Sequence, residues 1–176
     1  NPTSKNEHVA DEWWADELTP YLFTDCVVNH TKKLQILGDL KIQATTSNPL
    51  SGLDSITKGL TTVIGHPQVQ MKTVASHRSE IPTFLMTTGA VTVSDYSSTK
   101  AGYFAGFNHS FSAVVIEEYE DFCHVRQIHF DVDGIRDFGS LYSAENGVTQ
   151  IRAEAVVLGD EHVLFHSTEV KNATFD

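Results

Sequence analysis

The sequence contains no apolar run close to the roughly 18–20 residues that a membrane-spanning helix requires, which excludes a protein anchored by such a helix within these 176 residues. Basic residues are also scarce, since 12 Lys and Arg stand against 23 Asp and Glu for a formal net charge of −11. The chain therefore lacks the broad basic surface by which most nucleic-acid-binding proteins hold phosphates. Bound divalent metal ions are the remaining source of positive charge for handling DNA.

Cysteine is nearly absent. Cys26 and Cys123 stand far apart and match no metal-binding or redox spacing. We interpret them as buried or free thiols of a reducing compartment, and a single disulfide in a secreted protein is the alternative. The chain also has no Gly-x-Ser-x-Gly elbow, no phosphate-binding glycine loop and no dinucleotide fingerprint, which argues against the common serine-hydrolase and nucleotide-binding classes.

What the chain does contain is typical of a soluble globular domain, with 40% hydrophobic and 20% charged residues. Its length suits one domain, or one domain and part of a second. The sequence predicts a flexible lead-in over residues 1–10 and a β-rich domain over 11–150. The character of the chain changes in 151–176, where we expect the truncated start of a second domain.

Helical signals are few. Residues 11–18 (DEWWADEL) predict a short helix with acidic residues in its first turn, ended by Pro20. The adjacent Trp13 and Trp14 are more typical of a docking anchor than of a ligand platform. Residues 47–58 are turn-rich, and Asp54 with Ser55 suits a single helical turn.

Period-two patterns dominate the rest of the chain. Residues 33–46 predict one strand bulged at Gly38, or two short strands around a turn there. Short strands are expected at Thr61–Ile64, Val69–Val74, Phe84–Thr88 and Val148–Arg152. The strongest pattern is a hairpin of Phe107–Glu118 with Phe122–Phe130. The predicted fold class is therefore α+β, with a β-rich, mostly antiparallel sheet and a few short helices.

A candidate metal site follows the apolar stretch Ala153–Leu158, which has the character of a strand buried on both faces. Gly159 follows it, and then come Asp160, Glu161 and His162. The two-residue step places the Asp160 oxygen and the His162 nitrogen on one side of an extended chain, where both reach one metal ion. A carboxylate with an imidazole suits Mn, Fe or Zn. The alternative is an ordinary strand that ends in a polar turn.

Further motifs lie upstream of this segment. In order along the chain they are LGDLKIQAT, GHPQVQMKT, TTGAVT, YSSTKAG, FNHSFSAVVIE, VRQ and GDEH. Over roughly residues 13–162 this series resembles an upstream region of calcineurin-like metallophosphoesterases of tailed bacteriophages, related to DNA-transfer and host-DNA-degrading proteins. The sequence departs from the family pattern at Asn108, where the family has the first of two histidines, so only His109 carries over.

The resemblance implies a hydrolase or nuclease that cleaves phosphodiester bonds in the cytoplasm of an infected bacterium. Asp160 and His162 would hold one of two divalent ions, Mn²⁺ by preference, and DNA is the implied substrate. Only 14 residues follow His162, so the remaining ligands would lie beyond residue 176. The alternative is a self-contained, non-enzymatic module that binds nucleic acid or protein.

Four polar residues of the β-rich region are candidate contacts for substrate or nucleic acid: Lys100, His109, Arg126 and Gln127. Alternation along the strand places Arg126 on the face of His124, and Gln127 on the opposite face. The four residues therefore line one pocket only if the strand is bulged. The alternative interpretation is that they make cross-strand hydrogen bonds and stabilise turns.

Overall fold

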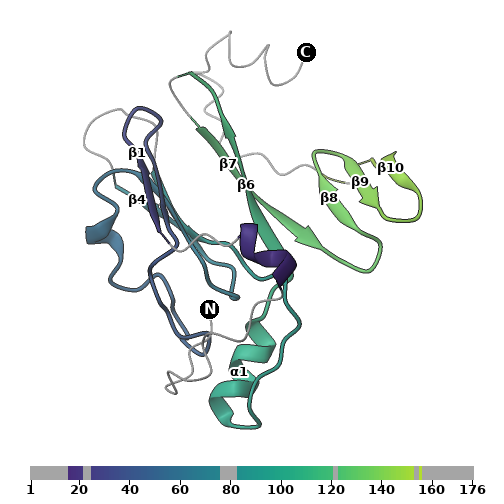
Figure 1. Cartoon of the computed structure of the whole chain (residues 1–176), viewed down its shortest axis with the longest axis horizontal. Helices are drawn as coiled ribbons and strands as arrows, with labels where there is room; N and C mark the ends of the chain where they lie inside the picture. The colour runs from purple at the N-terminus through teal and green to yellow at the C-terminus, as the bar shows by residue number, and fades with distance from the viewer. Residues whose placement is uncertain (1–15, 22–24, 76–82, 121–122, 153–154, 156–176) are drawn as a thin grey trace.

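The structure of the protein is a computed structural model, which describes residues 16–21, 25–75, 83–120, 123–152 and 155. Within these ranges the strands form two five-stranded sheets, and a single α-helix lies in the segment that connects them (Figure 1). The predicted β-rich α+β class is confirmed. No helix among the described residues is long and apolar enough to cross a membrane.

The strands before residue 88 form what we call the N-terminal sheet. They are β1 (Cys26–Asn29), β2 (Leu34–Leu37), β3 (Thr61–Ile64), β4 (Met71–Val74) and β5 (Thr83–Thr87), in the spatial order β1-β2-β3-β5-β4. β2, β3 and β5 run parallel, whereas β1 and β4 are antiparallel edge strands. Six of the eight described strand pairs in the molecule are antiparallel, as expected. The parallel centre was not predicted, because it depends on pairing between distant segments.

The hydrophobic core covers one face of this sheet. Leu37, Ile64 and Leu85 lie on neighbouring strands and pack with Leu50 of the β2–β3 connection. That connection covers the sheet with partly buried side chains and the 3₁₀ turn η3 (Asp54–Ile56), which forms where a helical turn was predicted. β3 is buried along its whole length, as expected for a central parallel strand.

The bounds of several strands agree with the sequence patterns. One bulged strand or two short strands were predicted over residues 33–46, and only the first half forms a strand, β2. β3 has the expected bounds, and β4 and β5 begin within two residues of them. After β2 the chain bends at Gly38 and continues without a strand. The apolar side chains of Leu40 and Ile42 instead pack onto the core, because the sheet face needs a hydrophobic cover there.

The 3₁₀ helix η2 (Asp16–Tyr21) overlaps the helix predicted over residues 11–18 only at its end. Residues 11–15 lie outside the described residues, so that part of the prediction is not tested. Pro20 lies inside η2 and does not end it. Proline fixes φ near the helical value and lacks only an N–H, so one short 3₁₀ turn tolerates it.

The strands after residue 111 form what we call the C-terminal sheet, an antiparallel meander in the order β10-β9-β8-β7-β6. Its strands are β6 (Ser112–Glu118), β7 (Cys123–Phe130), β8 (Ile135–Asp137), β9 (Ser140–Ser143) and β10 (Gly147–Gln150). The predicted hairpin corresponds to β6 and β7, and turns at residues 131–134 and 144–146 connect β7 to β8 and β9 to β10.

The start of the predicted hairpin is wrong, because Phe107 and Asn108 belong to the helix α1 (Lys100–Asn108) and not to a strand. Thr99 caps this helix by accepting a hydrogen bond from the Gly102 N–H at 3.1 Å. The alternation of Phe107, His109 and Phe111 suggested a strand, but the cap and the close packing at Gly102 favour a helix. A Cβ at Gly102 would collide with the backbone of Ser97.

Residues 88–90 form a strap that joins the two sheets. On one side, the N–H groups of Thr88 and Gly89 donate to the carbonyl oxygens of Ile64 and His66. On the other side, Ala90 exchanges backbone hydrogen bonds with Ser110 and Ser112 at the start of β6. Gly89 has a φ of 76°, and a Cβ there would overlap Ser112 Oγ, so only glycine fits this crossing.

The β6–β7 hairpin lies lengthwise against the N-terminal sheet (Figure 1). Near its tip, Lys32 of the β1–β2 turn pairs with Glu118 at 2.6 Å. Towards its other end, Gln127 donates to the carbonyl oxygen of Thr88 at 2.7 Å. Lys32 and Thr88 mark opposite ends of the parallel strands. The hairpin face that carries Gln127 is therefore turned toward the N-terminal sheet, and the face that carries Arg126 is turned away.

Candidate functional site

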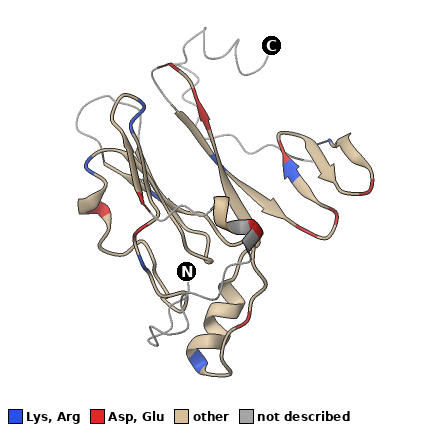
Figure 2. Cartoon of the chain, viewed as in Figure 1, with Lys and Arg blue, Asp and Glu red and all other residues tan. Residues whose placement is uncertain are grey.

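The structure does not bring the four candidate contact residues into one pocket. Lys100 is the exposed first residue of α1, and His109 is the residue that caps the other end of that helix. Arg126 and Gln127 are neighbours on β7 and point to opposite faces, as the alternation predicted. Figure 2 shows the Lys and Arg residues of the described part scattered over several elements.

His109 holds the loop before α1 against the end of the helix. Its Nε2–H donates to the carbonyl oxygen of Thr92 at 2.8 Å, so in the neutral ring Nδ1 accepts from the Tyr96 hydroxyl at 2.9 Å. The ring also makes edge contacts with Tyr96 and Phe111. Burial raises the pKa of the Tyr96 hydroxyl, which keeps this donor protonated. Both ring nitrogens are therefore used in hydrogen bonds to the loop before α1.

Arg126 is the centre of a polar cluster on the outer face of the hairpin. Its Nε and Nη2 donate to the two carboxylate oxygens of Asp137, both at 2.8 Å, a bidentate pair. Nη1 lies 2.9 Å from Glu117 Oε2, close enough for an ion pair although the N–H is poorly aligned for a hydrogen bond. The hydrogen bonds to Asp137 raise the pKa of Arg126, and the same contact lowers the pKa of Asp137. The guanidinium charge is thus neutralised within the chain.

Phe138 completes this cluster in an unfavourable backbone conformation. It lies at the β8–β9 turn with a φ of 44°, a region that bulky residues avoid. The Arg126 guanidinium carbon lies 4.3 Å from the centre of its ring, and the His124 ring stacks on it at 6.2 Å. The side chain is still 72% exposed. No sequence signal other than the following Gly139 marked this position.

Gln127 connects the hairpin to the strap. Its Nε2 and the hydroxyl of Ser112 both donate to the carbonyl oxygen of Thr88, at 2.7 and 3.2 Å. Gln127 Oε1 is buried and has no hydrogen-bond partner among the described residues. This residue therefore fixes the relation between the two sheets, which fits the interpretation that it serves structure.

His66 is a buried histidine that the sequence analysis did not single out. It is 2% exposed, its Nε2 donates to the carbonyl oxygen of Gln43, and its Nδ1 accepts from the Gln68 N–H, both at 3.1 Å. This pattern assigns the neutral Nε2–H tautomer. Burial lowers the pKa of His66, because the charged ring would lose its solvation and meet an N–H donor at Nδ1.

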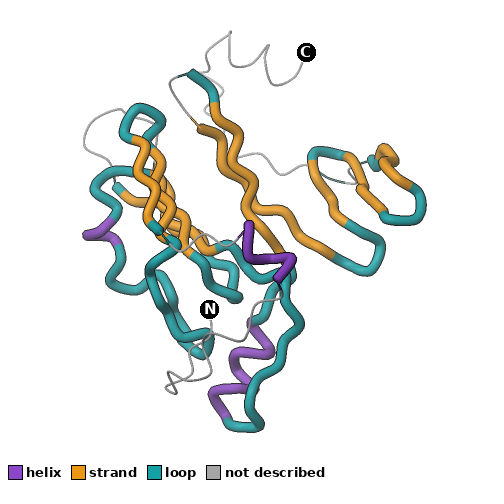
Figure 3. The backbone as a smooth tube through the Cα atoms, in the orientation of Figure 1, coloured by secondary structure: helices purple, strands orange, loops and turns teal. Residues whose placement is uncertain are grey.

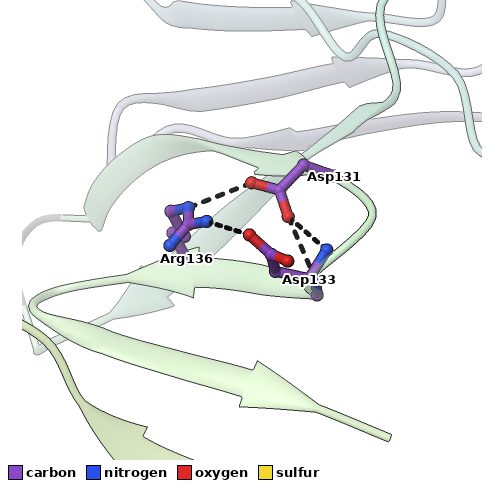
Figure 4. Close-up of polar contacts among 4 residues, drawn as sticks. Asp131, Asp133 and Arg136 are labelled. Atoms are coloured by element: carbon purple, nitrogen blue, oxygen red, sulfur yellow. Dashed lines mark hydrogen bonds and ion pairs between the residues drawn. The ribbon is translucent and has the colours of Figure 1, made fainter.

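An acidic turn connects β7 to β8 (Figure 4). Asp131 Oδ1 accepts from the N–H groups of Asp133 and Gly134, and its Oδ2 accepts from Arg136 Nε at 3.0 Å. Asp133 accepts from Arg136 Nη2 at 2.8 Å. The backbone donor of Asp133 is the main reason why the pKa of Asp131 is lowered. The turn borders an open hollow of about 460 Å³, but its two aspartates are occupied by Arg136 and by the turn.

The proposed metal ligands Asp160 and His162 lie outside the described residues, as does most of the strand expected over 153–158. Within the described ranges, no three His, Cys, Asp or Glu side chains lie close enough together to hold a metal ion. The chain shows no match to protein-family models, to curated proteins or to solved structures. The resemblance to phage metallophosphoesterases therefore depends on the sequence motifs, and the metal site stays a prediction.

Proposed function

We propose that the described residues form a non-catalytic accessory domain of a metal-dependent phosphoesterase or nuclease that acts on phosphodiester bonds. The supporting observation is that the candidate contact residues do not form one site. Three of the four are held by contacts within the chain, and they lie on different elements and faces. In this proposal the catalytic chemistry begins at Asp160 and His162, after the C-terminal sheet.

In this proposal Asp160 and His162 hold one divalent ion, and further ligands follow residue 176. The donor set of a carboxylate and an imidazole suits Mn²⁺ and also Fe or Zn. When bound, two such ions would supply a hydroxide nucleophile and stabilise charge on phosphorus. DNA is the proposed substrate, and the cytoplasm of a bacterium infected by a phage is the proposed location.

The test is hydrolysis of a chromogenic phosphodiester with added Mn²⁺, using the full product of the gene. We expect D160A and H162A each to lower the metal-dependent rate by more than about 100-fold, since even residues that only orient metal ligands contribute 10–100-fold. Glu145→Ala, an exposed carboxylate of the β9–β10 turn, is the matched control and should leave the rate unchanged. Unchanged hydrolysis in both ligand variants would reject the proposal.

Phe138 favours a second candidate, a nucleic-acid-binding module that works without a metal. An exposed aromatic ring kept in a strained conformation is a feature of functional positions. Such a ring offers a stacking surface for an unpaired base. The discriminating measurement is the anisotropy of a labelled single-stranded oligonucleotide with and without chelator.

If the accessory-domain proposal is right, DNA binding should need metal. If the protein is instead a metal-independent binding module, chelator should leave binding unchanged. Phe138→Ser should then weaken binding by about 1–3 kcal/mol, the usual loss for one stacked base. Val148→Ser, another exposed apolar residue of the same sheet, is the matched control.

A further inference from the structure

Six of the exposed apolar side chains of the described residues belong to α1, to the loop before it and to the residue before β6. We call this set the α1 surface, and it consists of Val91, Val93, Tyr103, Phe104, Phe107 and Phe111. Phe107 is 89% exposed and Val93 is 82% exposed. Isolated apolar residues on a surface are ordinary, but contiguous sets mark a site that another segment or molecule covers.

His109, the residue that caps the end of α1, connects the loop, the helix and the residue before β6. His109 links its parts, because the ring bonds to Thr92 between the two valines and packs against Phe111. Tyr103 and Phe107 are four residues apart and share one face of the helix. The α1 surface is therefore one patch built from a loop, a helix and the residue before β6.

The position of α1 leaves this patch without cover from either sheet. Figures 1 and 3 show the helix at one end of the molecule, beyond the strands of both sheets. Of its nine residues only Gly102 and Ala105 are buried. A helix this short depends on packing for its stability, so a covering partner is expected on energetic grounds.

The N-terminal segment enters the fold at the same end of the N-terminal sheet. Cys26 pairs with Leu37, the last residue of β2, and the carbonyl oxygen of Asp25 accepts from the Gly38 N–H. The register places Leu37 beside Ile64 and Ile64 beside Thr87, where the strap toward α1 begins. The segment that precedes β1 and the segment that leads to α1 therefore both lie at the same end of the strands of this sheet.

The N-terminal segment is long enough to extend well beyond this end of the sheet. Ten residues separate Trp14 from Asp25, and six of them form η2. A 3₁₀ helix rises about 2 Å per residue, and the other four residues extend at most about 3.3 Å each. The total reach is about 25 Å, roughly twice the length of a nine-residue helix at 1.5 Å per residue.

The chemistry of the two partners also matches. Trp13 and Trp14 are the only tryptophans in the chain, and they stand in an acidic segment, DEWWADEL. Lys100 is the one Lys or Arg between residues 91 and 111, and it lies at the N-terminus of α1, where negative charge is favourable. We propose that Trp13 and Trp14 dock on the α1 surface and that the N-terminal segment is the occupant of this patch.

Tryptophan fluorescence tests the proposal directly, since both reporters lie in the docking segment. In the intact chain we expect a blue-shifted emission maximum and acrylamide quenching several-fold weaker than in a peptide of residues 1–20. Phe107→Ser and Tyr103→Ser should each restore strong quenching. Both residues are exposed, so far-ultraviolet circular dichroism should stay unchanged. Val132→Ser, a fully exposed apolar residue of the β7–β8 turn, is the matched control and should change nothing.

Two results would overturn the proposal. Tryptophans that are quenched in the intact chain as strongly as in the peptide would show that the segment does not dock. Protection that disappears on dilution, together with a dimer mass by light scattering, would assign the patch to a second copy of the chain. Concentration-independent protection that either serine variant removes is the result we expect.

Discussion

Different interactions stabilise the two sheets of this protein. Eight of the nine buried apolar residues in the described part lie between Leu34 and Met86, in and around the N-terminal sheet. Within the described strands β6–β10 the only buried side chain is the hydroxyl-bearing Ser112. The C-terminal sheet relies on cross-strand pairs such as Arg126 with Asp137, and on aromatic contacts at Phe138.

This difference predicts different stabilities. Burial of apolar area contributes much more to folding than partly exposed ion pairs do. The C-terminal sheet should therefore open locally at a lower free energy than the N-terminal sheet. Regions with low local stability are also where binding surfaces are commonly found, which suits the exposed positions of His124 and Phe138.

The largest expected effect is in the N-terminal core. Leu85 is fully buried between β3 and β4, so Leu85→Ala should lower the free energy of unfolding by about 2–5 kcal/mol. Leu141→Ala on β9, which is only partly buried, should cost clearly less. Urea denaturation measures both changes, and equal losses would contradict the contrast between the sheets.

A second prediction addresses the strap between the sheets. Gly89→Ala should cost about 1–3 kcal/mol, because it forces a positive φ on alanine and pushes a Cβ into Ser112. Gly65→Ala is the matched control, since Gly65 has open space around it and no positive φ. Thermal unfolding should separate the two variants. If Gly89→Ala unfolds at the same temperature as the Gly65→Ala control, the strap does not require glycine at this position.

The third prediction concerns pH. The pKa of His66 is lowered in the fold, so the unfolded chain takes up a proton first as pH falls through about 6.5. The stability that neutral His66 contributes is therefore complete above that pH and declines below it. His66→Gln should remove this part of the pH dependence in denaturation curves recorded between pH 5 and 8. The carboxylates act at lower pH, so their contribution stays separable.

The smallest global effect is expected in the C-terminal sheet. Arg126→Met removes the partner of Asp137 and of Glu117 but leaves the hydrophobic core intact. Hydrogen exchange should then speed up in β7 and β8 while β3 and β5 keep their protection. Lys72→Met, which removes the exposed pair with Asp54, is the control for loss of a surface charge. Equal acceleration in both sheets would mean that they open together.

The sequence predicted the parts of the fold that depend on local pattern. Alternation along the chain predicted β3, the β7 strand and the opposite faces of Arg126 and Gln127. The parallel order of β2, β3 and β5 was not predicted, because partners separated by more than twenty residues leave no local signal. The edge strand β1 and the short β8 and β9 were also missed.

The candidate site shows the same division. Types and positions of polar residues could be found in the sequence, but their partners could not. Asp137 and Phe138 reach Arg126 only because β8 pairs beside β7, and Thr92 reaches His109 only because α1 folds the loop back. Phe107 was placed on a strand because it alternates with His109 and Phe111, whereas the structure has it in α1.

The parallel centre of the N-terminal sheet also has a consequence for the order in which the chain assembles. Pairing Leu34 with Thr61 closes a loop of more than twenty residues, whereas β6 and β7 are joined by a short turn. Local hairpins form within about 1–10 μs, whereas pairing of distant segments is slower because closing the loop between them costs entropy. The β6–β7 hairpin can thus form early. It packs stably against the N-terminal sheet only after β5 has paired with β3 and the strap has formed. Folding rate should accordingly respond to changes in β3 and β5 more than to changes in β8–β10.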